Sequence, residues 1–422
     1  MVPPRSAGHT SFFPNGGKSK EPRNSGAQSS LLRQLNTREV LTALQRHGPL
    51  SRAEIARHTG ISGPTITRTV LDLLAGKLLE EGELPPPVAA DASSARANGN
   101  RPALGRPGKV LRLASASVSV QGVVIGVQQC ELTNAGLDGS WQAEPRTFAT
   151  PKRYNDLVRK IVEQLVRSRE QSKTSVLGVG ISIPGLLRRK DKRTLVSPNL
   201  HQTDGQQLGV DVAERLQSLG LSSEVVLLQE TQALCLGERM YGAAREIHDF
   251  AMVDLTDGLG LGVVQGGQFV EGSNGLAGEL GHITVDLHGR PCGCGNHGCL
   301  ETVATDAALA AAISARQGRQ LTLGEWLPLI QAGEVKIEDE LSEWLDYLSV
   351  GLAAVINLFN PSRLFVHGHA LDAAPDLFDR VKQQTAKRAL APSLADCQII
   401  RAQGSKRHGA VAAIIQQLTG GR

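Results

Sequence analysis

The stretch GELGHITVDLHGRPCGCGNHGCLE, residues 278–301, decides which fold the larger part of this chain adopts. It holds Cys292, Cys294 and Cys299 within eight residues, and the intervening glycines let the backbone turn tightly enough for three thiolates to meet. His282 lies ten residues upstream and supplies a fourth ligand. Three cysteines and one histidine form a closed tetrahedral set, so the stretch predicts a structural Zn2+ site with these four ligands.

Two other interpretations of this cysteine cluster stay open, namely buried free thiols and a redox trio. His288 and His297 also compete for the fourth ligand position. His282 is favoured because Gly281 precedes it and Glu279 lies three residues before it. In a chain predicted to be cytoplasmic, three closely spaced cysteines favour a metal site over disulfides.

Apolar strands alternate with amphipathic helices from residue 110 to the C-terminus. Residues 118–127 and 175–183 have the apolar character of buried strands, and residues 154–168 have the period of an amphipathic helix. This alternation predicts an α/β architecture with largely buried sheets. We expect two lobes, residues 110–240 and residues 241–422, with the cysteine cluster in the second.

The N-terminal part predicts a separate winged helix-turn-helix domain over residues 31–83. Residues 1–30 are rich in Ser, Gly, Asn and Lys and are predicted to form a disordered tail. The predicted elements of the domain are an amphipathic helix over 31–48, a capping box at 51–54, a third helix over 64–75 and a wing strand over 77–83.

A short helix, a tight turn and a second helix with polar first residues is the geometry that enters a DNA major groove. Residues 1–110 hold 15 Lys/Arg against 8 Asp/Glu, whereas the remainder holds 30 against 33, so the excess positive charge lies at this end. The expected contacts to bases and phosphates are Arg52, Ser62, Gly63, Thr65, Thr67 and Arg68. A three-helix bundle without a DNA role is the alternative.

Residues 84–109 are rich in Pro, Ala, Gly and Asn and predict a wing tip and linker. Arg101 and Arg106 lie beside prolines in this segment. Extended arginines of this kind are drawn into a narrow minor groove by its enhanced negative potential. The segment is therefore either a second DNA contact or a plain interdomain linker.

No apolar run in the chain reaches the length that a membrane-spanning helix needs, and the first 30 residues lack the apolar core of a signal peptide. The sequence therefore predicts a cytoplasmic protein without membrane insertion.

Taken together, these motifs resemble the ROK family of repressors, open reading frames and sugar kinases, and specifically its regulators of the NagC/XylR type. The resemblance runs from about residue 31 to residue 420 and is carried by E-x-G-H at 279–282 and C-x-C-G-x-x-G-C-x-E at 292–301. It implies a two-lobed actin-like, hexokinase-like (ribonuclease H-like) domain behind the winged helix-turn-helix.

The resemblance also implies which residues contact a sugar or sugar phosphate effector in the cleft. These are Glu279, His282 and Glu301, together with Gln229 and Glu230, which stand where family kinases carry Asn-Asp. Carboxylates and an imidazole suit sugar hydroxyls, and a metal-held His282 keeps one ring nitrogen free for a ligand. The implied partners are double-stranded operator DNA and a second copy, in a homodimer or homotetramer.

Three departures from the family kinases favour a regulator without phosphoryl transfer. Residues 125–132 lack the Asp-x-Gly-x-Thr phosphate loop, Glu230 replaces the aspartate base, and Gly368 and His369 replace a Gly-Gly pair. We expect a repressor of genes for carbohydrate uptake or catabolism. The alternatives are an ATP-dependent sugar kinase with an accessory DNA-binding domain, for which Glu230 would be the catalytic base, and a docking protein that binds a protein in place of sugar.

Overall fold

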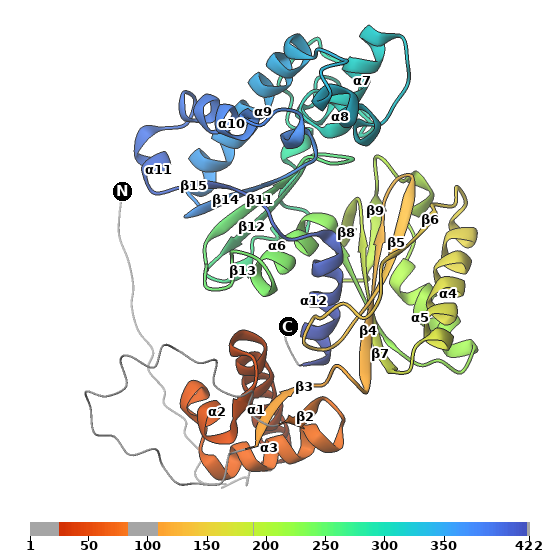
Figure 1. The fold of residues 1–422 in the computed structure, drawn as a ribbon, viewed down its shortest axis with the longest axis vertical. Helices are drawn as coiled ribbons and strands as arrows, with labels where there is room; N and C mark the ends of the chain where they lie inside the picture. The colour runs from red at the N-terminus through yellow and green to blue at the C-terminus, as the bar shows by residue number, and fades with distance from the viewer. Residues whose placement is uncertain (1–24, 83–108, 189, 420–422) are drawn as a thin grey trace, which may run out of the picture.

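The computed structural model describes residues 25–82, 109–188 and 190–419. These residues form a small N-terminal part and two larger lobes, which are arranged along the long axis of the molecule (Figure 1). Arg101 and Arg106, the predicted minor-groove contacts, lie outside the described residues, as do residues 1–24 of the predicted tail. Among the described residues, no helix combines the length and apolar character needed to cross a membrane.

The N-terminal part, here called the head, is a three-helix domain with a small sheet. Its elements are α1 (Ser25–His47), β1 (Leu50–Ser51), α2 (Arg52–Thr59), α3 (Gly63–Ala75), β2 (Leu79–Gly82) and β3 (Val110–Leu113), with sheet order β1-β3-β2. Leu41, Ile55, Ile66 and Val70 are fully buried between the three helices. The head is therefore the predicted winged helix-turn-helix, packed by the apolar stripes of its helices.

Two boundaries of the head differ from the sequence prediction. Helix α1 begins at Ser25 rather than at residue 31, so it extends into the predicted tail. Strand β3 pairs antiparallel with β2 and β1 and completes the wing, although residue 110 was predicted to open the first lobe. Strand β3 belongs to the head because of the strands with which it pairs, and the residue pattern of a single strand does not reveal its partner.

The first lobe is a mixed five-stranded sheet in the order β10-β7-β4-β5-β6. Its elements are β4 (Val118–Ile125), β5 (Gln129–Ala135), β6 (Arg146–Ala149), α4 (Tyr154–Gln171), β7 (Ser175–Ile183), β8 (Leu186–Arg188), β9 (Arg193–Val196), η1 (His201–Thr203), α5 (Leu208–Ser218) and β10 (Glu224–Gln229). Helices α4 and α5 pack on one face through an apolar cluster that includes Ile125, Leu157, Ile161 and Leu216.

The second lobe repeats this plan with the sheet order β13-β12-β11-β14-β15 and a cap of helices (Figure 1). Its elements are α6 (Glu230–Met240), β11 (Phe250–Asp254), β12 (Gly260–Gln265), β13 (Gln268–Phe269), η2 (Leu280–His282), η3 (Leu300–Thr302), α7 (Asp306–Gln317), α8 (Leu323–Gln331), α9 (Glu338–Phe359), β14 (Arg363–His367), η4 (Ala370–Asp372), α10 (Leu377–Ala386), α11 (Ala391–Ala395) and β15 (Gln398–Arg401). Trp326 and Trp344 are buried in the core of the cap.

The last helix, α12 (Lys406–Leu418), leaves the second lobe and packs on the free face of the first-lobe sheet. Two glycines set how closely it approaches. A Cβ atom at Gly180 would lie 1.9 Å from the Ala410 carbonyl oxygen, and one at Gly409 would lie 1.8 Å from that of Ala233. Helix α12 is therefore wedged between β7 and α6, and the division predicted at residue 241 does not describe it.

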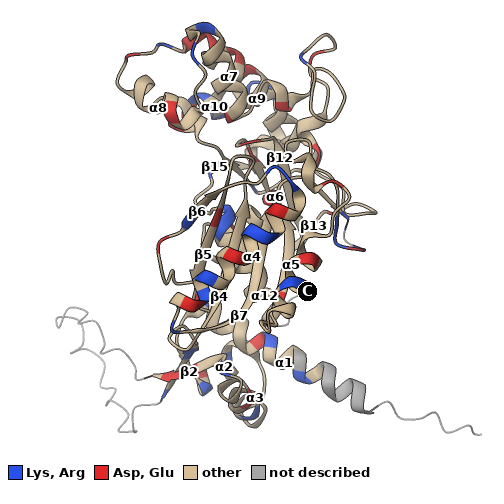
Figure 2. Ribbon diagram, turned by 90° about the vertical axis from the view of Figure 1, so that its right-hand side faces the viewer, with Lys and Arg blue, Asp and Glu red and all other residues tan. Residues whose placement is uncertain are grey.

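Helix α12 also joins the first lobe to the head. Val411 and Ile414 of α12 belong to one continuous buried cluster with Leu41 of α1 and Leu113 of β3. A shared core of this kind transmits a shift of one part to the other, because close-packed interiors have low compressibility. In the side view, Lys and Arg are interspersed with Asp and Glu over the body above the head (Figure 2).

Candidate functional site

The structure brings His282, Cys292, Cys294 and Cys299 together, with one ligand atom from each within 4.8 Å of the others. The Cys294 and Cys299 sulfurs are 3.8 Å apart, and the Cys292 sulfur lies 3.6 Å from His282 Nδ1. A tetrahedral Zn2+ with ordinary Zn–S and Zn–N bonds has edges of about 3.8 Å and about 3.6 Å. The four residues therefore have the spacing of a closed zinc set.

The backbone that forms this cluster depends on one glycine in particular. Gly298 has φ +66°, and a Cβ atom there would lie 1.6 Å from the Asp286 carbonyl oxygen. Isolated bridges at Thr284–Cys299 and Pro291–His297 close the loop. His288 and His297, the competing candidates, are exposed and lie outside the ligand group found among the described residues.

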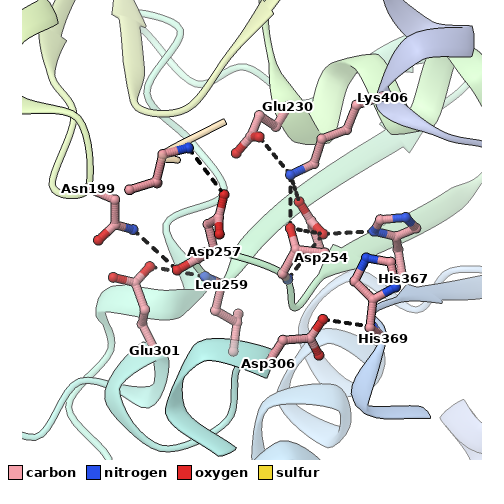
Figure 3. Close-up of polar contacts among 12 residues, drawn as sticks. Asn199, Glu230, Asp254, Asp257, Leu259, Glu301, Asp306, His367, His369 and Lys406 are labelled. Atoms are coloured by element: carbon pink, nitrogen blue, oxygen red, sulfur yellow. Dashed lines mark hydrogen bonds and ion pairs between the residues drawn. The ribbon is translucent and has the colours of Figure 1, made fainter. Parts of the chain in front are cut away.

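The five predicted sugar contacts line a single pocket between the lobes, here called the small pocket, with a volume of about 80 Å³. His282 Nε2 faces Glu279 at 3.8 Å, on the ring edge opposite the sulfur of Cys292. Glu301 accepts a hydrogen bond from the Leu259 N–H at 3.0 Å (Figure 3). The pocket thus presents one free imidazole nitrogen and several carboxylate oxygens, which are groups that hydrogen-bond hydroxyls.

The remaining two predicted contacts already have partners within the chain. Gln229 Nε2 donates to the Gly185 carbonyl at 2.9 Å, and Glu230 accepts from Lys406 Nζ at 2.6 Å. Burial raises the pKa of Glu230 to about 7, and Lys406 opposes this shift. Burial likewise raises the pKa of Glu279, with His282 opposing it. Of the five, Glu279, His282 and Glu301 offer the freer side chains.

A buried charge network centred on Lys406 lies behind the small pocket (Figure 3). Lys406 Nζ is 2.6 Å from Glu230, 2.9 Å from Asp254 and 2.8 Å from the Thr256 hydroxyl, and His367 Nδ1 is 2.9 Å from Asp254. Burial would raise the pKa of Asp254, but Lys406 and the His367 hydrogen bond outweigh it and hold the pKa well below its usual range. The two carboxylates raise the pKa of Lys406 against the effect of burial, so the ammonium stays charged.

The sequence prediction missed both Lys406 and Asp254. Two signals in the sequence point to them. Asp254 is the last residue of a buried apolar strand, and the open end of a sheet collects polar groups. Lys406 is the first residue of a helix, where the helix dipole disfavours a cation, so its position calls for a specific acidic partner.

A larger cavity of about 840 Å³, here called the large cavity, lies on the other side of this network. Gln128, Gln129 and Glu131 line it, and they belong to the segment that the family resemblance aligns with the phosphate loop of the kinases. The N–H of Val127 lies 3.4 Å from Asp257 Oδ2, so a carboxylate from the second lobe already occupies this turn. Glu131 in turn pairs with Arg407 at 3.3 Å.

Asp306 occupies the opposite wall of the large cavity, beside the dipeptide that replaces Gly-Gly. One oxygen accepts from the backbone N–H of His369 at 2.7 Å (Figure 3), and the other accepts from that of Ala370 at 2.9 Å. Burial raises the pKa of Asp306 to about 7, and these two hydrogen bonds oppose the rise. The backbone donors at this turn are therefore already bound to a protein carboxylate.

The start of α3 presents the predicted DNA contacts at the surface of the head. Ser62, Gly63, Thr67 and Arg68 are exposed and Thr65 is half-buried, while Ile66 and Val70 on the opposite side are buried. Pro64 lies in the first turn, where its missing N–H has no cost. Ser62 stands at the N-cap position but bonds the Thr65 hydroxyl at 2.9 Å instead of capping a backbone N–H.

Arg52 has a different setting from the other predicted contacts. The capping box of Ser51 and Glu54 forms as predicted and starts α2 at Arg52. The Arg52 guanidinium pairs with Glu81 of the wing at 3.0 Å, and Lys109 pairs with the same carboxylate at 2.5 Å. Arg52 therefore fixes the wing against α2, and a phosphate would have to compete with Glu81 for it.

Fold and site together define a two-lobed actin-like domain with a pocket between its lobes, joined to a winged helix-turn-helix. The ROK family model matches residues 120–417 and the MarR family model matches residues 34–86. The first match covers well over half of the chain, and the chain belongs to the ROK family.

Relatives and solved structures support this assignment along most of the chain. The xylose repressor of Bacillus subtilis (strain 168) is 24% identical, over 86% of this chain and 89% of its own. The DNA-binding transcriptional dual regulator NagC of Escherichia coli (strain K12) is 25% identical, over 93% and 95%.

Among solved structures, a ROK family transcriptional regulator, a homolog of the E. coli MLC protein, has a TM-score of 0.73 at 23% identity and covers 92% of this chain and 97% of its own. A ROK family glucokinase from Streptomyces griseus, in complex with glucose and AMPPNP, has a TM-score of 0.61 at 26% identity, over 70% and 98%. The kinase therefore matches a smaller part of this chain than the regulator does.

Proposed function

We propose that this chain is a sugar-responsive transcriptional repressor of genes for carbohydrate uptake or catabolism. The observation that carries the proposal is helix α12: it shares a buried core with the DNA-binding head, and its first residue, Lys406, enters the cleft beside the small pocket. The names of the two relatives, a xylose repressor and the regulator NagC, support the same assignment.

The DNA-binding surface in this proposal is the exposed start of α3. Arg68 is expected to bind a base edge or phosphate, and its loss to weaken operator binding by about 1–3 kcal/mol, roughly 5- to 150-fold. The measurement is fluorescence anisotropy of Arg68→Ala with a duplex selected from random sequences by the wild-type chain.

Arg159→Ala is the matched control, because Arg159 is an exposed arginine on α4 of the first lobe. It should bind the selected duplex like the wild type. Unchanged affinity of Arg68→Ala would remove this side chain from the interface.

The Zn2+ in this proposal is structural and is held by His282, Cys292, Cys294 and Cys299. Their mutual distances fit a tetrahedral ion, and three thiolates with an imidazole leave no open coordination position for chemistry. The bound ion would supply rigidity: it fixes the His282 ring so that Nε2 points at Glu279 and the small pocket.

Glu279 is the sugar contact whose removal gives the clearest test of the pocket. Glu279→Ala is expected to abolish the rise in melting temperature that the cognate sugar produces, because a ligand that binds the folded state stabilises it by mass action. The experiment is a thermal-shift screen of sugars on zinc-loaded protein. Glu334→Ala, an exposed glutamate of the second lobe, should keep the full shift. A shift that survives in Glu279→Ala would contradict the pocket assignment.

Two features support regulation without phosphoryl transfer. Lys406 is bonded to Glu230, the position of the kinase base, and Asp257 occupies a backbone donor where phosphates would lie. ATP-coupled turnover that is lost in Glu230→Gln would instead establish the sugar kinase, to which the glucokinase similarity and the large cavity point.

The regulatory step in this proposal is a change in lobe orientation when sugar closes the cleft. In a homodimer, such a change alters the spacing of two heads on a palindromic operator. The sugar must bind the two lobe orientations with different affinity for this to happen.

A further inference from the structure

Acidic side chains dominate the lining of the small pocket. Its ionisable lining residues are Glu230, Asp254, Asp257, Glu279, His282 and Glu301. No lysine or arginine is among the described residues that line it. A ligand in this pocket therefore meets carboxylates on several sides, with His282 as the only basic side chain in its described wall.

The nearest buried cation has no hydrogen-bond donor left for a ligand. An ammonium group has three N–H donors. Lys406 Nζ lies within 2.6–2.9 Å of three partners, Glu230, Asp254 and Thr256. An anionic ligand could gain Lys406 only by displacing a buried carboxylate, which would then be left without its counterion.

The backbone and metal groups around the pocket offer an anion no better site. Helix α6 begins at Glu230, so a carboxylate already stands at the helix N-terminus that opens toward the pocket. The N–H of Val127 faces Asp257. A Zn2+ bound by three thiolates would carry a net negative charge with its ligands, so it would not offset the carboxylates.

Glu230 and Asp257 place carboxylates where the small pocket meets the large cavity. Both residues line the small pocket and the large cavity, so they form the wall between the two. A phosphate on the end of a sugar that lies against this wall would meet both carboxylates. The small pocket, about 80 Å³, is also far below the 300–1,000 Å³ of ordinary ligand sites, which favours a small ligand.

We propose that the effector is an uncharged monosaccharide and that the site rejects the phosphorylated form of the same sugar. This inference rests on the proposed function, since it specifies the effector of the same pocket. Hydroxyl groups donate to the carboxylates, whereas a phosphate dianion is repelled by them and finds no free cation.

The test compares matched pairs of ligands on the full-length, zinc-loaded protein by calorimetric titration and thermal shift. The pairs are glucose, mannose, N-acetylglucosamine and N-acetylmannosamine, each with its 6-phosphate, and xylose is added alone. We expect one free sugar to bind and its 6-phosphate to bind on the order of 100-fold more weakly, because like charges brought together in a binding site cost several kcal/mol.

Asp257→Asn tests the cause of this selectivity. Removing one carboxylate from the dividing wall should narrow the difference between a sugar and its 6-phosphate by roughly 5- to 10-fold, through tighter binding of the phosphate. Asp396→Asn is the matched control, because Asp396 is exposed and lines neither cavity, and it should leave the ratio unchanged.

The outcomes separate this inference from the proposed function. A 6-phosphate that binds as tightly as its free sugar, or more tightly, would overturn the inference while the sugar-responsive repressor stands. An unchanged ratio in Asp257→Asn would also contradict the electrostatic cause. Binding of DNA with no response to any sugar or sugar phosphate would reject the sugar effector itself, and the inference with it.

Discussion

Replacement of Cys299 by alanine is expected to empty the metal site and to weaken sugar binding by roughly 10- to 100-fold. Cys299 is fully buried, and its sulfur lies 3.8 Å from that of Cys294. Without the metal, nothing fixes the His282 ring, and the glycine-rich loop loses the ion that holds its turns together. Zinc content by atomic absorption should fall from about one ion per chain to near zero.

Cys397→Ala is the matched control for this prediction. Cys397 is a buried cysteine of the second lobe that is not part of the ligand group. Its replacement should leave zinc content and sugar affinity intact. The affinity of Cys299→Ala for DNA in the absence of sugar should also change little, because the cysteine cluster belongs to the second lobe and α3 to the head. Full zinc content in Cys299→Ala would contradict the ligand assignment.

Replacement of Lys406 by methionine is expected to lower the free energy of unfolding by about 3–5 kcal/mol. The change removes the counterion of two buried carboxylates, Glu230 and Asp254, and leaves them close together in a site of low polarity. Removing one partner of a buried ion pair costs more than the pair contributes, because the remaining charge is left unpaired. Urea denaturation gives the measurement.

A second variant identifies the cause of this loss. Lys406→Met combined with Glu230→Gln has one unpaired buried charge fewer, so it should recover part of the stability that the single variant loses. Lys382→Met is the control, because Lys382 forms an exposed ion pair with Asp379 on α10, and it should change stability by less than about 1 kcal/mol. If the double and single variants lose the same free energy of unfolding, the loss comes from the packing of α12 and not from an unpaired charge.

The regulatory role of Lys406 has its own readout. If α12 carries the signal from the cleft, then the Lys406→Met chain that remains folded should bind operator DNA with a reduced response to sugar. Anisotropy titrations with and without the cognate sugar measure this response. A full response would place the coupling elsewhere in the shared core of α12, the first-lobe sheet and the head.

The local features of this chain follow from short stretches of sequence. The capping box at Ser51 and Glu54 and the position of Pro64 are set within one helical turn, and the structure has both. The cysteine cluster is equally local, since its three thiols lie on one glycine-rich loop. The two-lobed fold followed from the family resemblance of the motifs in residues 279–301, and the family match bears it out.

Features that depend on distant residues did not follow in the same way. Lys406 is 176 positions from Glu230, its partner, and no period in the sequence connects them. Strand β3 lies next to the first lobe in the chain but pairs with β1 and β2 of the head. Arg52 looked free to bind phosphate because its partner, Glu81, lies 29 residues away in the wing.

The sequence by itself determined the types of element, the metal-ligand set it predicts and the membership in a sugar-binding family, because each depends on residue types at short, fixed spacings. Only the tertiary structure decided which charges neutralise one another in the cleft and which helix links the cleft to the head. The reason is that Lys406 is stabilised by Glu230 of α6 and by Asp254 and Thr256 at the end of β11, and that α12 is held by close contacts at Gly180 of β7 and Ala233 of α6. Such a balance of burial against charge exists only once the chain has folded.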